Sequence, residues 1–168
     1  KVDKEKARCG EPLLTVSGLD YYNQEGKEVL KDVGFTVRER QILGIAGVEG
    51  NGQNEHAECI FGMRRPASGS IRLTGDELTG SSINDIRRHG ISYVPEDRMT
   101  TGVCKDASIW ENLISDRVDT EQILSHRLLN GKKIFGLARR LLEEFRIHCK
   151  NEYQPVGMLS GGNMQKVV

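Results

Sequence analysis

The sequence predicts an α/β domain, and three features of the chain carry this prediction. An apolar segment, residues 42–46, runs directly into a glycine-rich turn at residues 47–52, and a helical pattern follows at residues 53–61. A longer stripe at residues 132–147 has the period of an amphipathic helix. Short apolar runs between turn residues predict strands. A chain of 168 residues is long enough to bury one sizeable core.

The composition excludes several classes of protein. Lys+Arg and Asp+Glu each number 24, so the formal net charge is zero, which argues against nucleic-acid binding through bulk electrostatics. No apolar run approaches the roughly 20 residues that span a bilayer, and the N-terminus has no export signal, so we expect a soluble chain. The four cysteines have no metal-ligand spacing. They are expected to be idle thiols in a reducing compartment, and two disulfides are the alternative.

The first half of the chain is predicted to be rich in strands. Residues 1–11 are charged and small and are typical of a tail or linker. Residues 13–16 and 33–37 predict strands joined by a polar turn. Residues 42–46 are apolar on both faces, which is typical of a central strand covered on both sides. Residues 68–75 predict an edge strand.

The second half is predicted to be mainly helical. Residues 82–90 predict a short helix closed by glycine, and residues 91–94 predict a strand that ends before proline. Residues 108–113 open a helix with a capping-box arrangement, whereas residues 115–131 predict a loop. The helix over residues 132–147 is expected to point Arg139, Arg140, Glu143 and Glu144 to solvent as i,i+4 pairs.

The turn after residues 42–46 has the frame of a phosphate-binding loop, G-x-x-x-x-G-K-[ST]. In such a loop the backbone N–H groups surround phosphate oxygens, and the following helix adds its positive end. Gln53 stands where the lysine belongs, and Asn54 stands where a hydroxyl would ligate Mg²⁺. A glycine turn without any ligand is the alternative. The candidate phosphate-binding residues are Gly47, Gly50, Asn51, Gly52, Gln53 and Asn54.

A second motif lies about a hundred residues further on. Leu159, Ser160, Gly161, Gly162 and Asn163 match the ABC signature sequence, whose usual form is LSGGQ. A serine hydroxyl and two glycine N–H groups at a helix start form a second phosphate site. Alone, such a turn is usually a loop; after a phosphate-binding frame it is what an ABC-type nucleotide-binding domain requires.

With residues 93–98, these segments carry a resemblance. Residues 42–53, 93–98 and 159–166 resemble the second ATP-binding half of the tandem ABC ATPases that energise bacterial simple-sugar and nucleoside importers. The resemblance implies an α/β P-loop NTPase core of ABC type with an antiparallel β edge and a helical subdomain. It divides the chain into residues 1–11 (tail), 12–95 (P-loop core and β subdomain), 96–158 (Q-loop and helical subdomain) and 159–168 (signature and following helix).

The family also implies what this segment lacks. Its Walker B aspartate and catalytic glutamate would lie beyond Val168, so the domain is expected to be truncated before Walker B and to hold no catalytic residue of its own. Family members usually keep serine or threonine at the position of Asn54, so Mg²⁺ ligation by this loop is in doubt. Arg40 stands in a turn where the family usually has glycine, which predicts local backbone strain.

ABC domains pair head to tail and hold ATP between the loop of one half and the signature of the other. The resemblance therefore implies that Ser160, Gly161 and Gly162 complete the ATP site of a first half on the same polypeptide. The loop at residues 47–54 would bind nucleotide weakly or without turnover. Transmembrane permease subunits and an extracytoplasmic solute-binding protein are the implied further partners, at the cytoplasmic face of the plasma membrane.

Several residues keep two interpretations. Tyr21 or Tyr22 stacks on adenine, or both are strand-end aromatics. Glu96 takes the Q-loop position and acts as a metal ligand. In the alternative this segment has no such role, and Asp97 and Arg98 simply pair with each other. Trp110 is a core residue or a permease contact.

Two rival functions also stay open. One is a catalytically silent regulatory nucleotide-binding module. The other is a soluble ABC ATPase of DNA repair or translation, a class that usually has the intact lysine and either coiled coils or basic surfaces that this sequence lacks.

Overall fold

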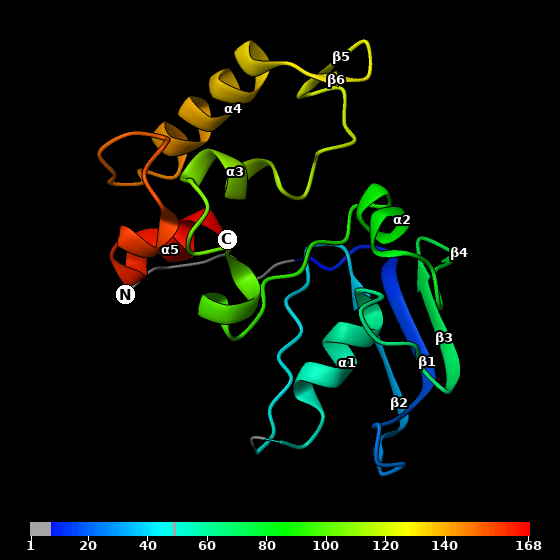
Figure 1. Ribbon diagram of the computed structural model, residues 1–168. Coiled ribbons are helices and arrows are strands. Elements are labelled where there is room, and N and C mark those ends of the chain that lie inside the picture. Colours follow the sequence, from blue (N-terminus) through cyan, green and yellow to red (C-terminus); the bar gives the residue numbers. More distant parts are fainter. Residues whose placement is uncertain (1–7, 49) are drawn as a thin grey trace. The chain divides into compact units, whose positions relative to one another are not determined.

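The computed structural model describes residues 8–48 and 50–168, with the backbone alone for Arg98. Residues 1–7 of the predicted tail and Glu49 of the glycine turn lie outside the described residues. The chain divides between Tyr93 and Val94 into two compact units (Figure 1), and each is described by itself. Within the described part of the chain, no helix is both long and apolar enough to cross a membrane.

The first unit is built on a four-stranded antiparallel sheet. Its strands are β1 (Pro12–Tyr22), β2 (Glu28–Arg38), β3 (Ser68–Leu73) and β4 (Asp76–Glu77), in the order β2-β1-β3-β4. The predicted edge strand is therefore wrong in its position, because β3 pairs with β1 on one side and with the two-residue β4 on the other. The strands at residues 13–16 and 33–37 are confirmed, and both are longer than predicted.

Two helices accompany this sheet, α1 (Gln53–Ile60) and α2 (Ile83–Arg88). The rings of Phe35 on β2 and His56 on α1 meet edge to face at 6.2 Å. The core of the unit combines side chains from the sheet and from both helices: Val16, Leu19, Tyr21, Leu30, Cys59, Phe61, Ile71, Leu73, Leu78 and Ile86. Residues 53–61 and 82–90 therefore form the predicted helices.

The two other predicted strands are wrong. Residues 42–46 and 91–94 have no regular secondary structure. A strand requires a hydrogen-bonded neighbour, and none of the strand pairs among residues 8–48 and 50–168 includes these segments. The expected cover on both faces is also missing there, since Ile42 is 98% exposed.

A close approach between strands fixes the middle of the sheet. Asp20 on β1 accepts hydrogen bonds from Asp32 N–H on β2 (2.6 Å) and from the Ser68 hydroxyl on β3 (2.5 Å), which lowers the pKa of Asp20. Gly69 on β3 has φ 97°, and a Cβ there would overlap the backbone of Gly18. Arg40 has φ 60°, so the predicted strain in its turn is confirmed.

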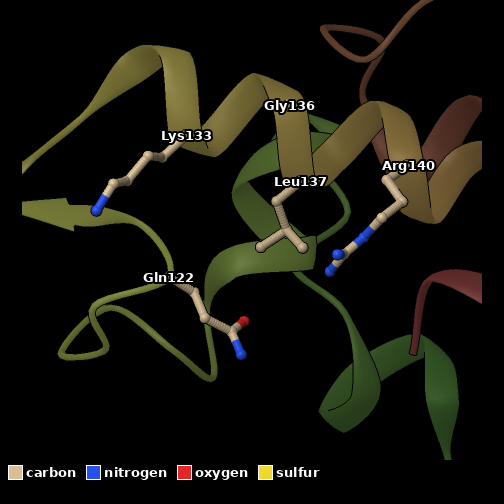
Figure 2. A pocket seen from close by; sticks show the side chains of 5 residues that line it. All are labelled: Gln122, Lys133, Gly136, Leu137 and Arg140. Atoms are coloured by element: carbon tan, nitrogen blue, oxygen red, sulfur yellow. The ribbon is translucent and has the colours of Figure 1, made fainter.

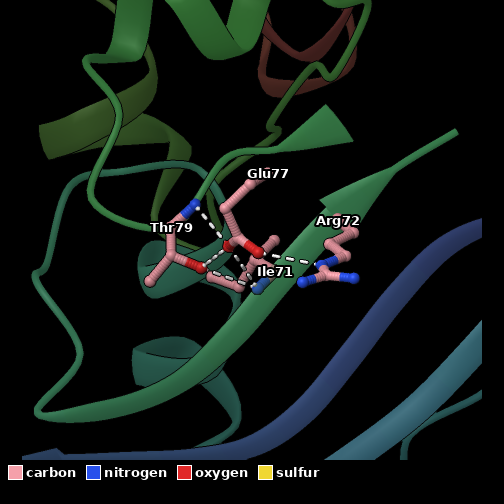
Figure 3. Close-up of polar contacts among 4 residues, drawn as sticks. All are labelled: Ile71, Arg72, Glu77 and Thr79. Atoms are coloured by element: carbon pink, nitrogen blue, oxygen red, sulfur yellow. Dashed lines mark hydrogen bonds and ion pairs between the residues drawn. The ribbon is translucent and has the colours of Figure 1, made fainter. Parts of the chain in front are cut away.

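Polar contacts also tie β3 to β4 (Figure 3). Glu77 accepts hydrogen bonds from the Thr79 hydroxyl and from Arg72 Nε (2.9 Å), and these contacts lower its pKa to about 2. The Thr79 hydroxyl oxygen in turn accepts the Ile71 N–H at 2.7 Å. Glu77 thereby holds the short edge strand against its neighbour.

The second unit is mainly helical. Its helices are α3 (Ile109–Ile114), α4 (Gly131–Glu144) and α5 (Gly161–Val167), with a π-helical turn, η1 (Arg98–Gly102), and a 3₁₀ turn, η2 (Val156–Met158). The predicted capping box is confirmed, because Glu111 accepts the Ser108 N–H at 2.8 Å and Ser108 Oγ accepts the Glu111 N–H at 3.4 Å. Trp110 packs against Phe135 with ring centroids 5.5 Å apart, which favours its core interpretation.

Two predictions for this unit are wrong. Residues 115–131 contain a hairpin of β5 (Leu124–Ser125) and β6 (Leu128–Leu129), whose turn residues His126 and Arg127 have positive φ without any glycine. The solvent-exposed face of the helix is confirmed, since Arg139, Arg140, Glu143 and Glu144 are all exposed. The pairing of Arg139 with Glu143 along the helix is wrong, because Arg139 forms an ion pair with Glu152 at 2.9 Å.

We expect Gly69→Ala to destabilise the sheet much more than Gly75→Ala. Both glycines have nearly the same positive φ, 97° and 95°, so alanine costs about 1–2 kcal/mol of backbone strain at either position. At Gly75 a Cβ would meet no atom within 4 Å, whereas at Gly69 it would overlap Gly18. Urea unfolding should give a loss of about 3 kcal/mol or more for Gly69→Ala. Equal losses in the two variants would contradict the close approach.

Glu77→Gln is expected to reduce the loss of stability in acid. The folded-state pKa of Glu77, about 2, lies below its ordinary value of 4.5. Its stabilising contribution is therefore fully present above pH 4.5 and is lost as the pH falls toward 2. The side chain is 46% exposed, so the effect stays below about 1 kcal/mol. Unfolding free energies measured from pH 6 to pH 2 should fall less in Glu77→Gln than in the parent, and parallel curves would contradict this role.

Candidate functional site

The glycine loop lies between residues 42–46 and helix α1. Gly52 is the residue before α1 and has φ 91°. A Cβ on it would lie 2.9 Å from Leu30 Cδ2 and 3.1 Å from the Val29 carbonyl oxygen, so only glycine lets the loop seat against β2. Gly47, Gly50, Asn51 and Asn54 are exposed, as a loop that receives a ligand requires.

Inside this loop the side chain of Gln53 turns back on the backbone. Its Nε2 donates a hydrogen bond to the Val48 carbonyl oxygen at 3.0 Å. The same oxygen accepts the Asn51 N–H at 3.2 Å. The loop thus offers glycine backbone at the start of a helix, which fits a phosphate group, but Gln53 supplies no positive charge.

The signature residues form the start of α5 in the second unit. Ser160 is the N-cap, and its carbonyl oxygen accepts the Met164 N–H at 2.9 Å. Ser160, Gly161 and Gly162 are exposed, and a Cβ on either glycine would meet no atom within 4 Å. Leu159 and Met164 are buried and attach the turn to the core of the unit. The turn is therefore exposed at Ser160 and at both glycines, and it is anchored by the buried side chains of Leu159 and Met164.

Asn163 orients this turn through its side-chain amide. Nδ2 donates to Ser160 Oγ at 3.1 Å, and Oδ1 accepts the His148 N–H at 3.0 Å. Lys166 makes a second contact with the same neighbouring segment, since its Nζ donates to the Arg146 carbonyl oxygen at 2.7 Å. Sequence patterns did not reveal the supporting segment at residues 146–148, because both contacts join residues at least 15 positions apart.

The remaining candidate residues have separate surroundings. Glu96 is exposed. Asp97 caps η1 by accepting the N–H groups of Met99 (2.9 Å) and Thr100 (3.1 Å) and the Thr100 hydroxyl, and these contacts lower its pKa. The predicted pairing of Asp97 with Arg98 involves a side chain outside the described residues.

Tyr21 and Tyr22 differ sharply. Tyr21 is 8% exposed, and the guanidinium of Arg64 lies 5.4 Å above the centre of its ring. Arg64 Nη1 also donates to the Tyr21 hydroxyl at 2.7 Å. Tyr22 is 47% exposed and donates its hydroxyl to Glu28 at 3.1 Å. Of the two, only Tyr22 has a ring accessible to a stacking base.

No metal or nucleophile centre stands out among residues 8–48 and 50–168, where no group of three or more His, Cys, Asp or Glu side chains is placed to hold a metal. All four cysteines are free thiols. Burial raises the pKa of the Cys59 thiol to about 11, which makes it a poor nucleophile.

A shallow hollow lies beside α4, lined by Gln122, Lys133, Gly136, Leu137 and Arg140 (Figure 2). The Lys133 ammonium already donates to the carbonyl oxygens of Glu121 (3.0 Å) and Leu124 (2.6 Å). It therefore supports the hairpin beside α4. None of the predicted site residues lines this hollow.

Comparison with known proteins identifies the family of this chain. A family model described as ABC transporter matches residues 30–168. The chain belongs to the ABC transporter family. Both the glycine loop and the signature turn lie within the matched residues.

Three relatives named as import ATP-binding proteins have similar sequences. The guanosine import ATP-binding protein NupO of Bacillus subtilis is 32% identical over 100% of this chain and 33% of its own length. The glucose import ATP-binding protein TsgD13 of Haloferax volcanii is 35% identical over 99% of this chain and 31% of its own length. The ribose import ATP-binding protein RbsA 2 of Rhizobium johnstonii is 37% identical over 89% of this chain and 29% of its own length. The chain thus spans about a third of the length of these relatives.

Solved structures confirm the predicted fold class. A nucleotide-free ATP-binding cassette from an ABC transporter superposes with a TM-score of 0.70 at 16% identity, over 94% of this chain and 64% of that one. The cbiO1 protein of Clostridium perfringens superposes with a TM-score of 0.67 at 21% identity, over 94% of this chain and 59% of that one. The chain therefore has the ABC ATPase cassette fold, a P-loop NTPase architecture with an antiparallel sheet and a helical part.

We expect Asn163→Leu, but not Asn163→Asp, to expose the His148 amide to exchange. Aspartate keeps an acceptor oxygen for the His148 N–H, whereas leucine removes it. Loss of one such bond should raise the local exchange rate of His148 up to about tenfold. Amide hydrogen exchange followed by mass spectrometry measures this directly. Unchanged protection in Asn163→Leu would show that Asn163 does not support the turn.

Proposed function

We propose that this chain is the second ATP-binding half of an ABC importer ATPase that drives uptake of a simple sugar or nucleoside. Its signature turn completes the ATP site of the first half, and its own loop binds nucleotide weakly and without turnover. The observation that carries the proposal is the contrast between the two motifs. The serine–glycine turn is exposed and anchored by buried neighbours, whereas the glycine loop has neutral Gln53 in place of the lysine.

The relatives support the class of substrate. Their names describe import ATP-binding proteins for guanosine, glucose and ribose. Since this chain covers about a third of each, a second nucleotide-binding half fits within the remaining length of such a protein. The proposed partners are that first half, transmembrane permease subunits and an extracytoplasmic solute-binding protein, and the proposed location is the cytoplasmic face of the plasma membrane.

The chemistry of the loop supports weak binding. A hydrogen bond from a charged lysine to phosphate contributes about 1.5–3 kcal/mol, and Gln53 replaces that lysine with a neutral amide. Loss of the charge affects the transition state of phosphoryl transfer more than ground-state binding. When ATP is bound at the first half's loop, its triphosphate supplies the bond to be broken. Within this chain the loop's glycine N–H groups would hold the phosphates, and Asn54 replaces the hydroxyl that would ligate Mg²⁺.

The signature turn is suited to act on a neighbour's nucleotide. Ser160, Gly161 and Gly162, which supply a hydroxyl and N–H groups at the start of α5, are exposed residues. Such groups stabilise phosphate oxygens. Tyr22, with its accessible ring, is the proposed adenine contact of this half's own loop, and Glu96 the proposed Q-loop residue.

A catalytically silent regulatory module is the alternative function, and it is favoured by the same uncharged loop. The two differ in the role of the signature. In a regulatory module the turn could change without loss of hydrolysis by the full-length protein, whereas in the proposed function it could not.

We expect Ser160→Arg in the full-length protein to lower ATP hydrolysis and solute uptake at least tenfold, because arginine would fill the position of the partner's γ-phosphate contact. Ser115→Arg, at an exposed serine that ends α3 in the same unit, is the matched control and should stay within about twofold of the parent. Gln53→Lys should also change transport little. ATPase and uptake assays on reconstituted transporters give both readouts, and normal transport by Ser160→Arg would overturn the proposed function.

A further inference from the structure

The hollow beside α4 combines positive charge with an apolar wall on one face of the helix. Lys133, Leu137 and Arg140 follow one another at spacings of four and three residues, which places them on the same face of an α-helix. Figure 2 shows Lys133 and Arg140 on either side of Leu137, with Gln122 coming from the preceding loop. None of the five lining residues is acidic, and the hollow has a volume of about 380 Å³.

Two polar side chains of this hollow have unused hydrogen-bond donors. Within the described part of the chain, the Arg140 guanidinium and the Gln122 amide have no hydrogen-bond or ion-pair partner. The neighbouring Arg139, in contrast, pairs with Glu152 at 2.9 Å. The Lys133 ammonium keeps one N–H beyond the two that it gives to carbonyl oxygens. The hollow therefore offers positive charge and free donors, which suit carboxylate oxygens.

A glycine in the middle of α4 leaves the backbone open at this hollow. Glycine in a helix interior is less favourable than alanine. No described atom lies within 4 Å of a Cβ placed on Gly136, so packing against the described residues does not require glycine at this position. Gly136 lines the hollow, where the missing side chain allows another chain to approach the helix backbone closely.

We infer that the hollow is a docking surface for an extended acidic segment of a partner protein. Lys133 and Arg140 are separated by about 10 Å along the helix axis, so one carboxylate does not reach both. An extended segment of about three residues has this length, and it would lie across Leu137 and Gly136. A shallow hollow suits such a segment better than a small molecule, because small-molecule sites bury most of the ligand surface. The inference goes beyond the proposed function and does not depend on either nucleotide motif.

The experiment measures binding of fluorescein-labelled decaglutamate to the full-length protein by fluorescence anisotropy. Arg140→Glu should weaken binding about fivefold or more, because a like charge replaces a fork of charged donors. Lys132→Glu is the matched control, since it makes an equivalent change at an exposed position of α4 that does not line the hollow. Its affinity should stay within about twofold of the parent. Arg140→Gln, which adds no negative charge to α4, should also weaken binding if Arg140→Glu fails to fold.

Gly136→Ala separates a contact at the hollow from general charge attraction, because it changes no charge. It should weaken binding roughly threefold, since its methyl group stands where the segment would approach the helix. It should also raise the thermal unfolding temperature, because alanine favours the helix. A structural role for Gly136 would instead lower that temperature. Unchanged binding by Gly136→Ala would overturn the docking surface.

The remaining outcomes decide the nature of the ligand. Free glutamate should compete only at carboxylate concentrations about tenfold or more above those of the peptide, because its charges are not linked. Competition at equal carboxylate concentration would indicate a site for single carboxylates and would overturn the segment. Equal losses in Arg140→Glu and Lys132→Glu, or no binding of decaglutamate by the parent, would overturn the docking surface. All these failures would leave the proposed function in place.

Discussion

The close packing of Gly52 against β2 is the constraint on which the start of α1 depends, and Gln53, the first residue of α1, bonds back to the Val48 carbonyl. Gly52 must be glycine because β2 passes within 3.1 Å of where its Cβ would lie. This close seat fixes the start of α1, and the start of α1 places Gln53 at the right distance from Val48.

The signature turn depends on the opposite arrangement. Ser160, Gly161 and Gly162 are exposed. The buried side chains of Leu159 and Met164 and the hydrogen bonds of Asn163 and Lys166 hold the turn in place. In the loop, the Gln53 side chain bonds to the loop's own backbone, whereas the signature turn is anchored through residues 146–148. This difference is the physical basis for proposing that the turn completes the ATP site of the first half and that the loop binds nucleotide without turnover.

The sequence was a good guide wherever local physics decides the structure. The capping box at Ser108, the stripe of α4 and the strand pair of β1 and β2 depend on residues close together in the chain, and all three are confirmed. The motif order also led to the correct family and fold class.

Where long-range pairing decides, the sequence was a poor guide. Residues 42–46 and 91–94 have strand-like composition, but none of the described strands pairs with them. Arg139 pairs with Glu152 across a turn that no helical spacing reveals. The hydrogen bond from Gln53 to the Val48 carbonyl was equally hidden, because residue type gives the loss of charge but not the partner of the amide.

The central claim is that nucleotide contacts Ser160–Gly162 from the partner half's loop and not from residues 47–54. A cryo-EM structure of the full-length transporter with a non-hydrolysable ATP analogue tests it most directly. We expect density for a triphosphate between the first half's loop and Ser160, with the Gln53 amide still on Val48. A triphosphate cradled by residues 47–54, with Ser160 facing solvent, would contradict the assignment of roles.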